Sequence, residues 1–328
     1  MRRIGLVLEY AGTGYQGFQV QTGDVRAAKD EVAGDPGPEA ERTGHSREVG
    51  RPMRTAQTVR TVQTVQGAVE AAIARIAGEQ CKITGAGRTD AGVHALGQVA
   101  SFDTGSRIPG DRFAPALNTA LPTDVRVLRS FQAPEDFNAR YDAIAKVYRY
   151  IIVPSHIARA GEPGQEPEPG ARRNLGMQLG PGAQLGSAVL AGRALLVRHR
   201  LDVQAMSQAS GCLVGQHDFR AFASTGSSAK TSVRTIRRLE VRPVRCGILG
   251  LDAVAIEIEA DGFLYKMVRT IVGALLEVGA GRADAGYVER LLASGDRSIG
   301  PATAPPDGLY LVRVIYPEPV ATLVSGAT

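Results

Sequence analysis

The sequence predicts an α+β fold, because strand patterns and helix patterns follow one another without the strict strand–helix–strand rhythm of a parallel sheet. Residues 253–259 place Val254, Ile256 and Ile258 on one face, as a strand does, whereas residues 263–278 carry a continuous apolar stripe at helical spacing. The chain has 328 residues, of which 44% are hydrophobic, so it can form the packed core of one large domain or of two ordinary ones.

The N-terminal part is expected to start with a strand and a helix. Residues 2–10 alternate as a strand does and run into a glycine-rich turn. Apolar positions recur at helical spacing in residues 65–76, and Gly78 is expected to end this helix. Two short strands, at residues 82–84 and 97–102, are then expected on either side of a second glycine-rich loop.

The C-terminal part continues the same mixture. Strands are expected at residues 146–153, 236–242, 253–259 and 308–316, and helices at residues 203–215, at residues 263–278 and from Asp284. Asp202 can cap the first of these helices, because its side chain can accept hydrogen bonds from the free backbone N–H groups of the first turn.

Two stretches interrupt this pattern. Residues 23–61 and 158–192 are rich in Gly, Pro and Glu, and neither shows a sustained apolar period. We interpret both as low-complexity insertions that leave the surrounding fold intact, the first disordered or loosely ordered and the second exposed.

Composition favours a cytoplasmic protein. The 38 Lys and Arg against 33 Asp and Glu give a net charge of +5, which permits an acidic partner such as RNA without requiring one. No apolar run of about 18 residues could cross a membrane, and no apolar signal core follows Met1. The scattered cysteines, Cys81, Cys212 and Cys246, suit a reducing compartment and show no metal-ligand spacing.

The loop at residues 85–92 is the first candidate for chemistry. It has neither the helix that follows a dinucleotide-binding fingerprint nor the ending of a phosphate-binding loop. It does carry the carboxylate of Asp90 on a glycine-flanked turn, where the guanidinium of Arg88 would favour the ionised form. The alternative interpretation is an Asx-turn that only caps the hairpin.

Three other groups need a role. His94 could be a general base, but no cluster of Cys, His and carboxylates accompanies it, so we expect a structural role and no metal. Tyr148 and Tyr150 lie on a strand among basic residues, which suits base stacking, although both could fill the core and for Tyr150 we prefer that interpretation. Arg269 lies beside an apolar stripe, where it needs a carboxylate partner or must reach solvent.

A resemblance to a known family adds to this picture. Residues 87–94 read GRTDAGVH and, with Gly97, Gln98 and Val99, resemble the central signature of the tRNA pseudouridine synthase A family nearly letter for letter. Further blocks that resemble the family occur in order at residues 10–13, 17–19, 64–67, 137–141, 148–150, 215–219, 267–269 with Gly273, and 304–309. The resemblance covers the chain outside the two insertions, and Phe18 departs from it, since the family often has tryptophan there.

The resemblance implies a fold of two similar α/β halves with mainly antiparallel sheets, joined around a central basic cleft. The first half would comprise residues 1–140 and the second residues 141–328. It also implies a homodimer that binds tRNA and converts uridines at positions 38, 39 and 40 of the anticodon stem-loop to pseudouridine, without a metal or a cofactor.

The resemblance further assigns individual roles. Asp90 would be the nucleophile, acting covalently or by a glycal route, and Arg269 the buried cation that pairs with it. Tyr148 would stack on the uracil and help to remove the C5 proton, and Arg88 would fill the space that the extruded base leaves. Other implied tRNA contacts are Phe137, Asn138, Ala139, Arg140, Tyr141, Gly226, Ser227, Ser228, Ala229, Lys230 and, on a weaker match, Arg107.

Three alternatives remain open from the sequence. The chain could be an RNA-binding module without catalysis, although simple binding does not require the carboxylate of Asp90. It could perform the same chemistry on other uridines of tRNA or another RNA. An enzyme that acts on a small molecule through His94 is the third, and it fits the pattern least.

Overall fold

The computed structural model describes residues 1–19, 64–157, 190–224, 226, 229–246 and 251–326. The first predicted insertion therefore lies outside the described residues. The second does so as well, except for its last three residues, which form a turn that includes the buried side chain of Leu190.

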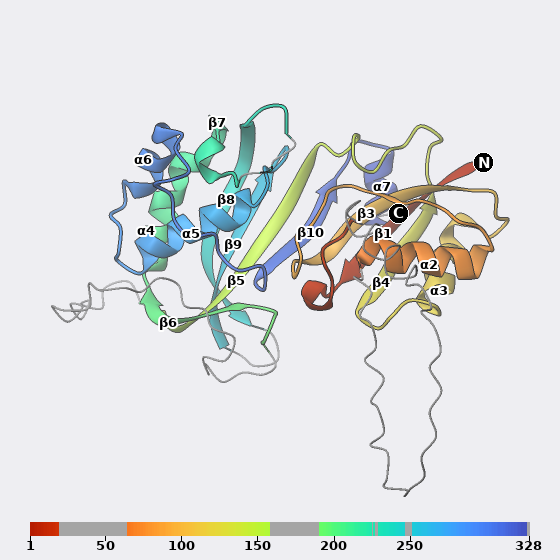
Figure 1. Ribbon diagram of the computed structural model, residues 1–328, viewed down its shortest axis with the longest axis horizontal. Helices are drawn as coiled ribbons and strands as arrows, with labels where there is room; N and C mark the ends of the chain where they lie inside the picture. Colours follow the sequence, from red (N-terminus) through yellow and green to blue (C-terminus); the bar gives the residue numbers. More distant parts are fainter. Residues whose placement is uncertain (20–63, 158–189, 225, 227–228, 247–250, 327–328) are drawn as a thin grey trace, which may run out of the picture.

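All strands of the described residues join one sheet, which is mostly antiparallel (Figure 1). They are β1 (Arg2–Tyr10), β2 (Thr84–Gly85), β3 (His94–Thr104), β4 (Val125–Gln132), β5 (Ala145–Ile157), β6 (Leu195–Leu201), β7 (Gly215–Asp218), β8 (Val233–Cys246), β9 (Leu251–Ala260) and β10 (Leu309–Ile315). The order is β4-β1-β3-β10-β5-β9-β8-β7, with β2 on β3 and β6 on β5. The predicted α+β class is confirmed.

The helices gather beside the two ends of the sheet (Figure 1). They are α2 (Val65–Ala77), α3 (Phe113–Asn118), α4 (Val203–Ser210), α5 (Met267–Gly279), α6 (Tyr287–Ser294) and α7 (Val320–Ser325). Helices α2 and α3 lie near β1 and β4, whereas α4, α5 and α6 lie near β8 and β9 (Figure 1). None of the helices in the described ranges has the length and hydrophobicity needed to cross a membrane.

Two predicted helix ends are confirmed, the end of α2 at Gly78 and the start of α4 at Asp202, and α2 also has a cap at Thr64 that was not predicted. The side chain of Thr64 accepts a hydrogen bond from the backbone N–H of Gly67 at the start of α2, and Gly78 ends this helix with a φ of 72°. The predicted cap at Asp202 is also present, because its side chain accepts from the backbone N–H of Ala205.

The predicted start of the long C-terminal helix was wrong by four residues. Lys266 has a φ of 59°, in the left-handed region, and α5 begins only at Met267. The apolar pattern continues upstream because Leu264 is buried from a loop, where it packs into the core without being helical. Similarly, the strand expected at residues 82–84 includes only Thr84, which pairs with Ser101 of β3.

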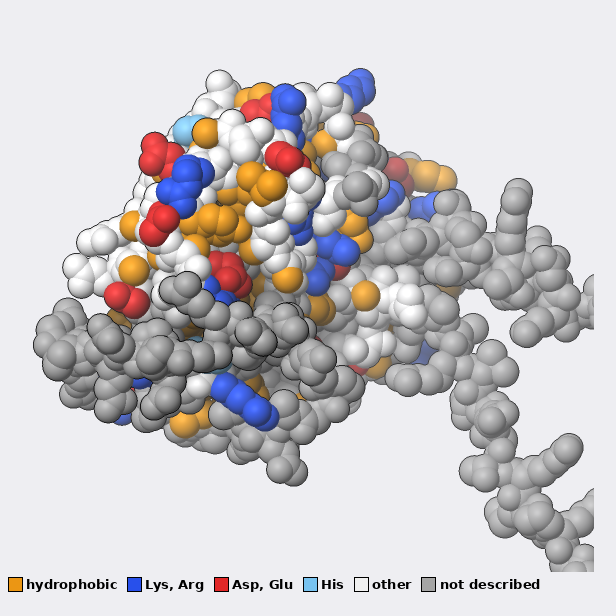
Figure 2. Space-filling model, turned by 60° about the vertical axis from the view of Figure 1, so that its left-hand side comes forward, with side chains coloured by type: hydrophobic (Ala, Val, Ile, Leu, Met, Phe, Trp, Pro, Cys, Tyr) orange, Lys and Arg blue, Asp and Glu red, His pale blue; other side chains and the backbone are white. Residues whose placement is uncertain are grey.

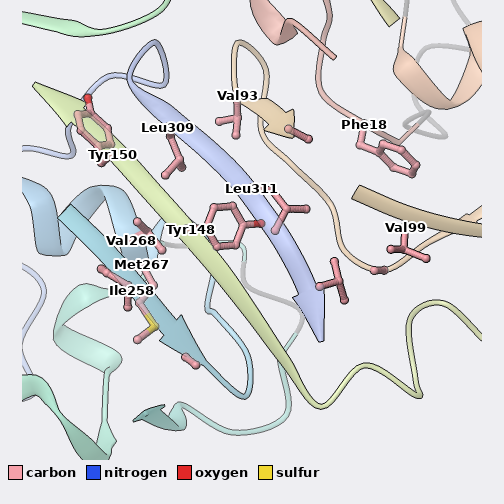
Figure 3. Close-up of a cluster of buried hydrophobic side chains, with 14 of the residues drawn as sticks. Phe18, Val93, Val99, Tyr148, Tyr150, Ile258, Met267, Val268, Leu309 and Leu311 are labelled. Atoms are coloured by element: carbon pink, nitrogen blue, oxygen red, sulfur yellow. The ribbon is translucent and has the colours of Figure 1, made fainter. Parts of the chain in front are cut away.

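The last strand, β10, lies between β3 and β5 and joins the two predicted halves. Tyr310 of β10 is in parallel register with His94, and Leu311 pairs with Tyr148 of β5. Figure 3 shows side chains from β5, β10 and α5 packed in this region, with Val93 across the seam. One continuous hydrophobic core therefore extends across both sides of the predicted boundary at residue 140.

Candidate active site

The loop that carries Asp90 connects β2 to β3 and turns back on itself. The backbone N–H of Val93 donates to the carbonyl of Asp90 at 3.1 Å. Gly92 has a φ of 80°, and a Cβ atom there would lie 2.9 Å from Cγ of Pro306. Both the positive φ and the close approach of Pro306 require glycine at position 92.

Buried hydrogen bonds fix the loop before Asp90. The hydroxyls of Thr89 and Tyr10 lie 2.8 Å apart, and the carbonyl of Thr89 accepts from the backbone N–H of Phe18 at 3.1 Å. The Gln98 side-chain amide donates to the carbonyl of Gly87 at 2.8 Å, and Gln98 is fully buried. The position of the carboxylate is thus set by the fold on both sides.

Arg269 provides the cation that faces Asp90. Its Nη1 donates to Oδ2 of Asp90 at 2.9 Å, and the two side chains are 12% and 24% exposed respectively. Its Nε donates to the carbonyl of Ala304 at 2.7 Å. The expectation that Arg269 needs a carboxylate partner is confirmed, and the solvent-reaching alternative is excluded.

Arg88 does not have the position that its spacing suggested. Its side chain is exposed, and its Nε donates to the side-chain oxygen of Gln19. The ion pair of Asp90 is made by Arg269, which is remote in sequence. Among the described residues, Arg88 therefore makes no ion pair with Asp90 or with another carboxylate.

The two tyrosines of β5 differ in their surroundings. Tyr150 is fully buried, and its hydroxyl donates to the carbonyl of Pro305 at 2.8 Å, so the core interpretation holds for it. Tyr148, which Figure 3 shows between β10 and α5, is 8% exposed. It packs edge-to-face against Phe263 with ring centroids 5.1 Å apart. Burial raises the pKa of the Tyr148 phenol, and the charge of Asp90 adds to this effect. The phenol is therefore neutral at pH 7.

His94 is a structural residue in this geometry. It is 2% exposed, its Nδ1 accepts from the backbone N–H of Gly12 at 3.1 Å, and its ring stacks on Tyr310 at 4.7 Å. Burial lowers the pKa of its imidazole. Within the described ranges, no group of three or more His, Cys, Asp and Glu side chains could hold a metal ion.

Comparison with known proteins places this site in a family. The family model described as tRNA pseudouridine synthase matches residues 51–142 and 209–317. The chain is 39% identical over 316 residues to tRNA pseudouridine synthase A of Acetivibrio thermocellus, which covers 96% of this chain and 100% of that protein. It is 37% identical over 318 residues to the enzyme of the same name from Syntrophomonas wolfei, covering 97% and 99% respectively.

The chain belongs to the tRNA pseudouridine synthase family. The family model's first matched range contains Asp90, and its second contains Arg269. The ion pair between these two residues consequently connects the two ranges that define family membership.

The predicted tRNA-contacting segment at residues 137–141 needs a correction for this synthase. Phe137 is 1% exposed and Ala139 is fully buried, so neither side chain can reach RNA in this conformation. Arg140 and Tyr141 are exposed, and the Arg140 guanidinium carbon lies 5.5 Å from the Tyr141 ring centroid. The buried members hold the segment in place, while Arg140 and Tyr141 can contact a ligand.

The remaining predicted contacts fall in two places. Gly226, Ala229 and Lys230 are exposed, whereas Ser227 and Ser228 lie outside the described residues. Arg107 follows the far end of β3, an 11-residue strand whose other end adjoins the Asp90 loop. At about 3.3 Å per residue this strand is roughly 35 Å long, so Arg107 and the Asp90 loop adjoin its opposite ends. A tRNA contact at Arg107 stays a prediction.

Sequence reasoning missed several residues that shape the site. Tyr10, Thr89 and Gln98 hold the Asp90 loop, and the carbonyl of Ala304 holds Arg269. The signal for Gln98 was present, because a polar residue within a strand of buried neighbours needs a hydrogen-bond partner.

The predicted central basic cleft stays a prediction, since the face in Figure 2 mixes basic, acidic and hydrophobic side chains.

Proposed function

We propose that this chain converts uridines at positions 38, 39 and 40 of the tRNA anticodon stem-loop to pseudouridine, with Asp90 as the nucleophile. The observation that carries the proposal is the largely buried ion pair of Asp90 and Arg269, on a loop that the fold fixes from both sides. The relatives that cover nearly the whole chain bear the name tRNA pseudouridine synthase A.

The chemistry needs a fixed anion beside the ribose. The bond between N1 of uracil and C1′ of ribose breaks, the base rotates, and a bond forms between C5 and C1′, after which C5 loses its proton and N1 gains one. Substrate and product are isomers, so no co-reactant is consumed. The carboxylate of Asp90 attacks C1′ or assists through a glycal, and the hydrogen bond from Arg269 holds it in a fixed orientation.

Tyr148 is assigned the stacking role in this proposal. Its ring is held against Phe263 at the seam between the two parts of the sheet. Because burial and the charge of Asp90 raise the pKa of its phenol, Tyr148 is a poor proton acceptor in the free enzyme. If Tyr148 removes the C5 proton, its phenol must lose the hydroxyl proton at the same time.

A uridine in a stem must leave the helix before it can reach Asp90, at a cost of a few kcal/mol. Arg88 is exposed on the loop, where its guanidinium is oriented by Gln19, and no carboxylate of the described residues pairs with it. This arrangement supports the role of filling the space that the base leaves.

We also propose a homodimer in the cytoplasm, where its tRNA substrate is made.

A binding module without catalysis is disfavoured by the same ion pair. A carboxylate that faces RNA repels phosphates, so a protein that only binds RNA would lose affinity by retaining Asp90. The same chemistry on other uridines is the second candidate, because the geometry of the loop carries no information about which nucleotide is presented.

Mapping pseudouridine in the tRNA of a deletion strain tests the proposal. Loss of pseudouridine at positions 38 to 40, restored by the intact gene and not by its Asp90→Asn variant, is the expected result. Loss at other uridines with the same complementation would retain the chemistry and reject the target. Restoration by the Asp90→Asn variant would reject the nucleophile.

A further inference from the structure

Lys146 lies on β5 on the same sheet face as Tyr148, because side chains two residues apart on a strand point the same way. Its backbone is in register with Ala260 of β9 and Val314 of β10, so it belongs to the central seam of the sheet. The side chain is half-buried. It is thus a cation on the catalytic face with restricted access to solvent.

The ammonium of Lys146 lies along the catalytic loop. A Cβ atom at Gly87 would be 3.2 Å from Cε of Lys146 and 3.9 Å from its Nζ. Gly87 precedes Asp90 by three residues, and its carbonyl is fixed by Gln98. The missing side chain at Gly87 leaves the space through which the lysine passes, and a larger residue there would crowd it.

Lys146 has no counter-ion among the described residues. Within the part of the chain that the structure describes, no carboxylate or carbonyl accepts a hydrogen bond from its Nζ. Burial lowers the pKa of Lys146, and the nearby charge of Arg140 lowers it further. The next basic residue along β5, Arg149, lies on the opposite face and donates to Glu257 at 2.6 Å. Among the described residues, neither Lys146 nor Arg140 forms an ion pair with a carboxylate.

We propose that Lys146, together with Arg140, binds one backbone phosphate next to the uridine that enters the site. The inference rests on the proposed function of the same site and adds a substrate-positioning residue to it. A phosphate would compensate both charges. Because it would pair with the ammonium, it would remove the unfavourable free energy of burying that charge alone. The contact would fix the RNA backbone relative to Asp90.

Salt dependence of RNA binding provides the first test. An Asp90→Asn parent is used, so that the anticodon stem-loop binds without turnover. Adding Lys146→Met keeps most of the apolar stem and removes the charge, and Lys82→Met, at an exposed lysine outside the site, matches it in net charge. Loss of one phosphate contact should lower the slope of log affinity against log salt by about one. The affinity lost between 50 and 200 mM salt should then be about threefold smaller in Lys146→Met than in Lys82→Met.

A scan of neutral phosphates provides the second test. Stem-loops are made with a single methylphosphonate at each position on either side of the target uridine. At one position the methylphosphonate should lower the affinity of the parent. At that position it should not lower the affinity of Lys146→Met, and at all other positions the two proteins should respond equally. Lys146→Arg should restore the response at that position, because it retains the charge.

Two results would overturn this inference. One is a salt slope for Lys146→Met equal to that of Lys82→Met. The other is a scan in which Lys146→Met responds like the parent at every position. This second result would also be obtained if the two cations bound free inorganic phosphate and not a phosphate of the RNA. Failure of the proposed function is distinguishable, because the enzyme with Asp90 intact would then make no pseudouridine on the unmodified stem-loop.

Discussion

Nη1 of Arg269 lies 2.9 Å from Oδ2 of Asp90, although 179 residues separate them in the sequence. Arg269 also donates to the carbonyl of Ala304, so its guanidinium is held at two points. A largely buried ion pair of this kind adds little net stability, but removal of either partner leaves the other charge uncompensated. We therefore expect its main contribution to be the orientation of the carboxylate.

Asp90→Asn should abolish pseudouridine formation and leave tRNA binding close to that of the unaltered enzyme. The amide retains an oxygen that can accept from Arg269, and the side chain keeps its shape, but it cannot act as a nucleophile. Turnover on an anticodon stem-loop and affinity for whole tRNA measure the two effects.

Asp103→Asn is the matched control for this change, because Asp103 pairs with Arg3 at the surface of β3, away from the loop. It should have the turnover of the unaltered enzyme. Retention of more than about a tenth of the rate by Asp90→Asn, which corresponds to a barrier increase below about 1.4 kcal/mol, would exclude the nucleophilic role.

The contrast between local and long-range features explains what the sequence could predict. Gly78 and Asp202 act within one turn of a helix, so their positions were legible. Lys266 adopts a left-handed conformation that no local pattern signals, and the apolar run through Leu264 pointed instead to helix. β6 was missed because its sequence, LLVRHRL, is mostly polar and exposed in its second half.

The site itself was predictable mainly through resemblance. From the glycines and the carboxylate at residues 85–92 alone, a hairpin cap was the favoured interpretation, because spacing does not show which cation approaches Asp90. Resemblance named Arg269, and the structure confirms the contact. The proximity of Lys146 to Gly87 was not predicted, since it depends on how β5 packs against a loop from another part of the sheet.

Tyr148→Phe should fold normally and retain substrate affinity within about threefold, because the ring keeps its contact with Phe263 and among the described residues its hydroxyl has no hydrogen-bond partner. If the hydroxyl participates in proton removal from C5, turnover falls while affinity does not. Single-turnover rates and binding constants for the same stem-loop separate the two.

Tyr148→Ala is a poorer probe of stacking than the sequence suggested, since the residue is only 8% exposed. Loss of a buried aromatic ring should lower the free energy of unfolding by about 3 to 5 kcal/mol. An alanine variant as stable as the phenylalanine variant would show that the ring is not part of the core.

His94 should make stability fall as the pH falls below about 6.5. Burial lowers the pKa of the folded imidazole, and the charge of Arg193 adds to this, while the backbone and carboxylate of Asp307 oppose it. The unfolded state then binds more protons between the two pKa values, so the free energy of unfolding rises with pH across this window.

Urea unfolding at pH 7.5 and 5.5 measures this dependence. His94→Gln should lose less stability on acidification than the unaltered enzyme, by up to about 1 kcal/mol. His199→Gln is the control, because His199 is exposed, and it should retain the full dependence. Equal slopes in the two variants would reject the assignment.

Lys266→Gly should be more stable than Lys266→Ala. Both changes remove the contact of the Lys266 ammonium with the Tyr265 ring at 4.9 Å, so the comparison isolates the backbone. At a φ of 59° a Cβ atom costs about 1 to 2 kcal/mol, against about 0.5 to 1 kcal/mol of backbone entropy for glycine. Thermal unfolding should favour glycine by up to about 1 kcal/mol, and an advantage for alanine would contradict the strain.

Replacement of residues 158–189 by a glycine–serine linker should leave a folded and active enzyme. β6 runs parallel to β5, with Ile152 opposite Leu195 and Ile157 opposite Leu201, so the linker must return along the strand. Five residues of strand correspond to about 17 Å, and a ten-residue linker spans up to about 33 Å. Closure of a loop of this length costs little extra entropy relative to a longer one.

Extension of the replacement to residue 192 should be less tolerated. The side chain of Leu190 is buried, and its carbonyl accepts from the backbone N–H of Arg193 at 2.9 Å. The hydroxyl of Thr13 donates to the carbonyl of Gly192 at 3.2 Å, which ties this turn to the N-terminal part of the chain. The longer replacement should therefore lower the free energy of unfolding by about 1 to 3 kcal/mol relative to the shorter one. Turnover on the stem-loop should persist when residues 158–189 are replaced, because Asp90, Tyr148 and Arg269 are unchanged. If replacement up to residue 192 gave the same stability, the turn at Leu190 would be dispensable.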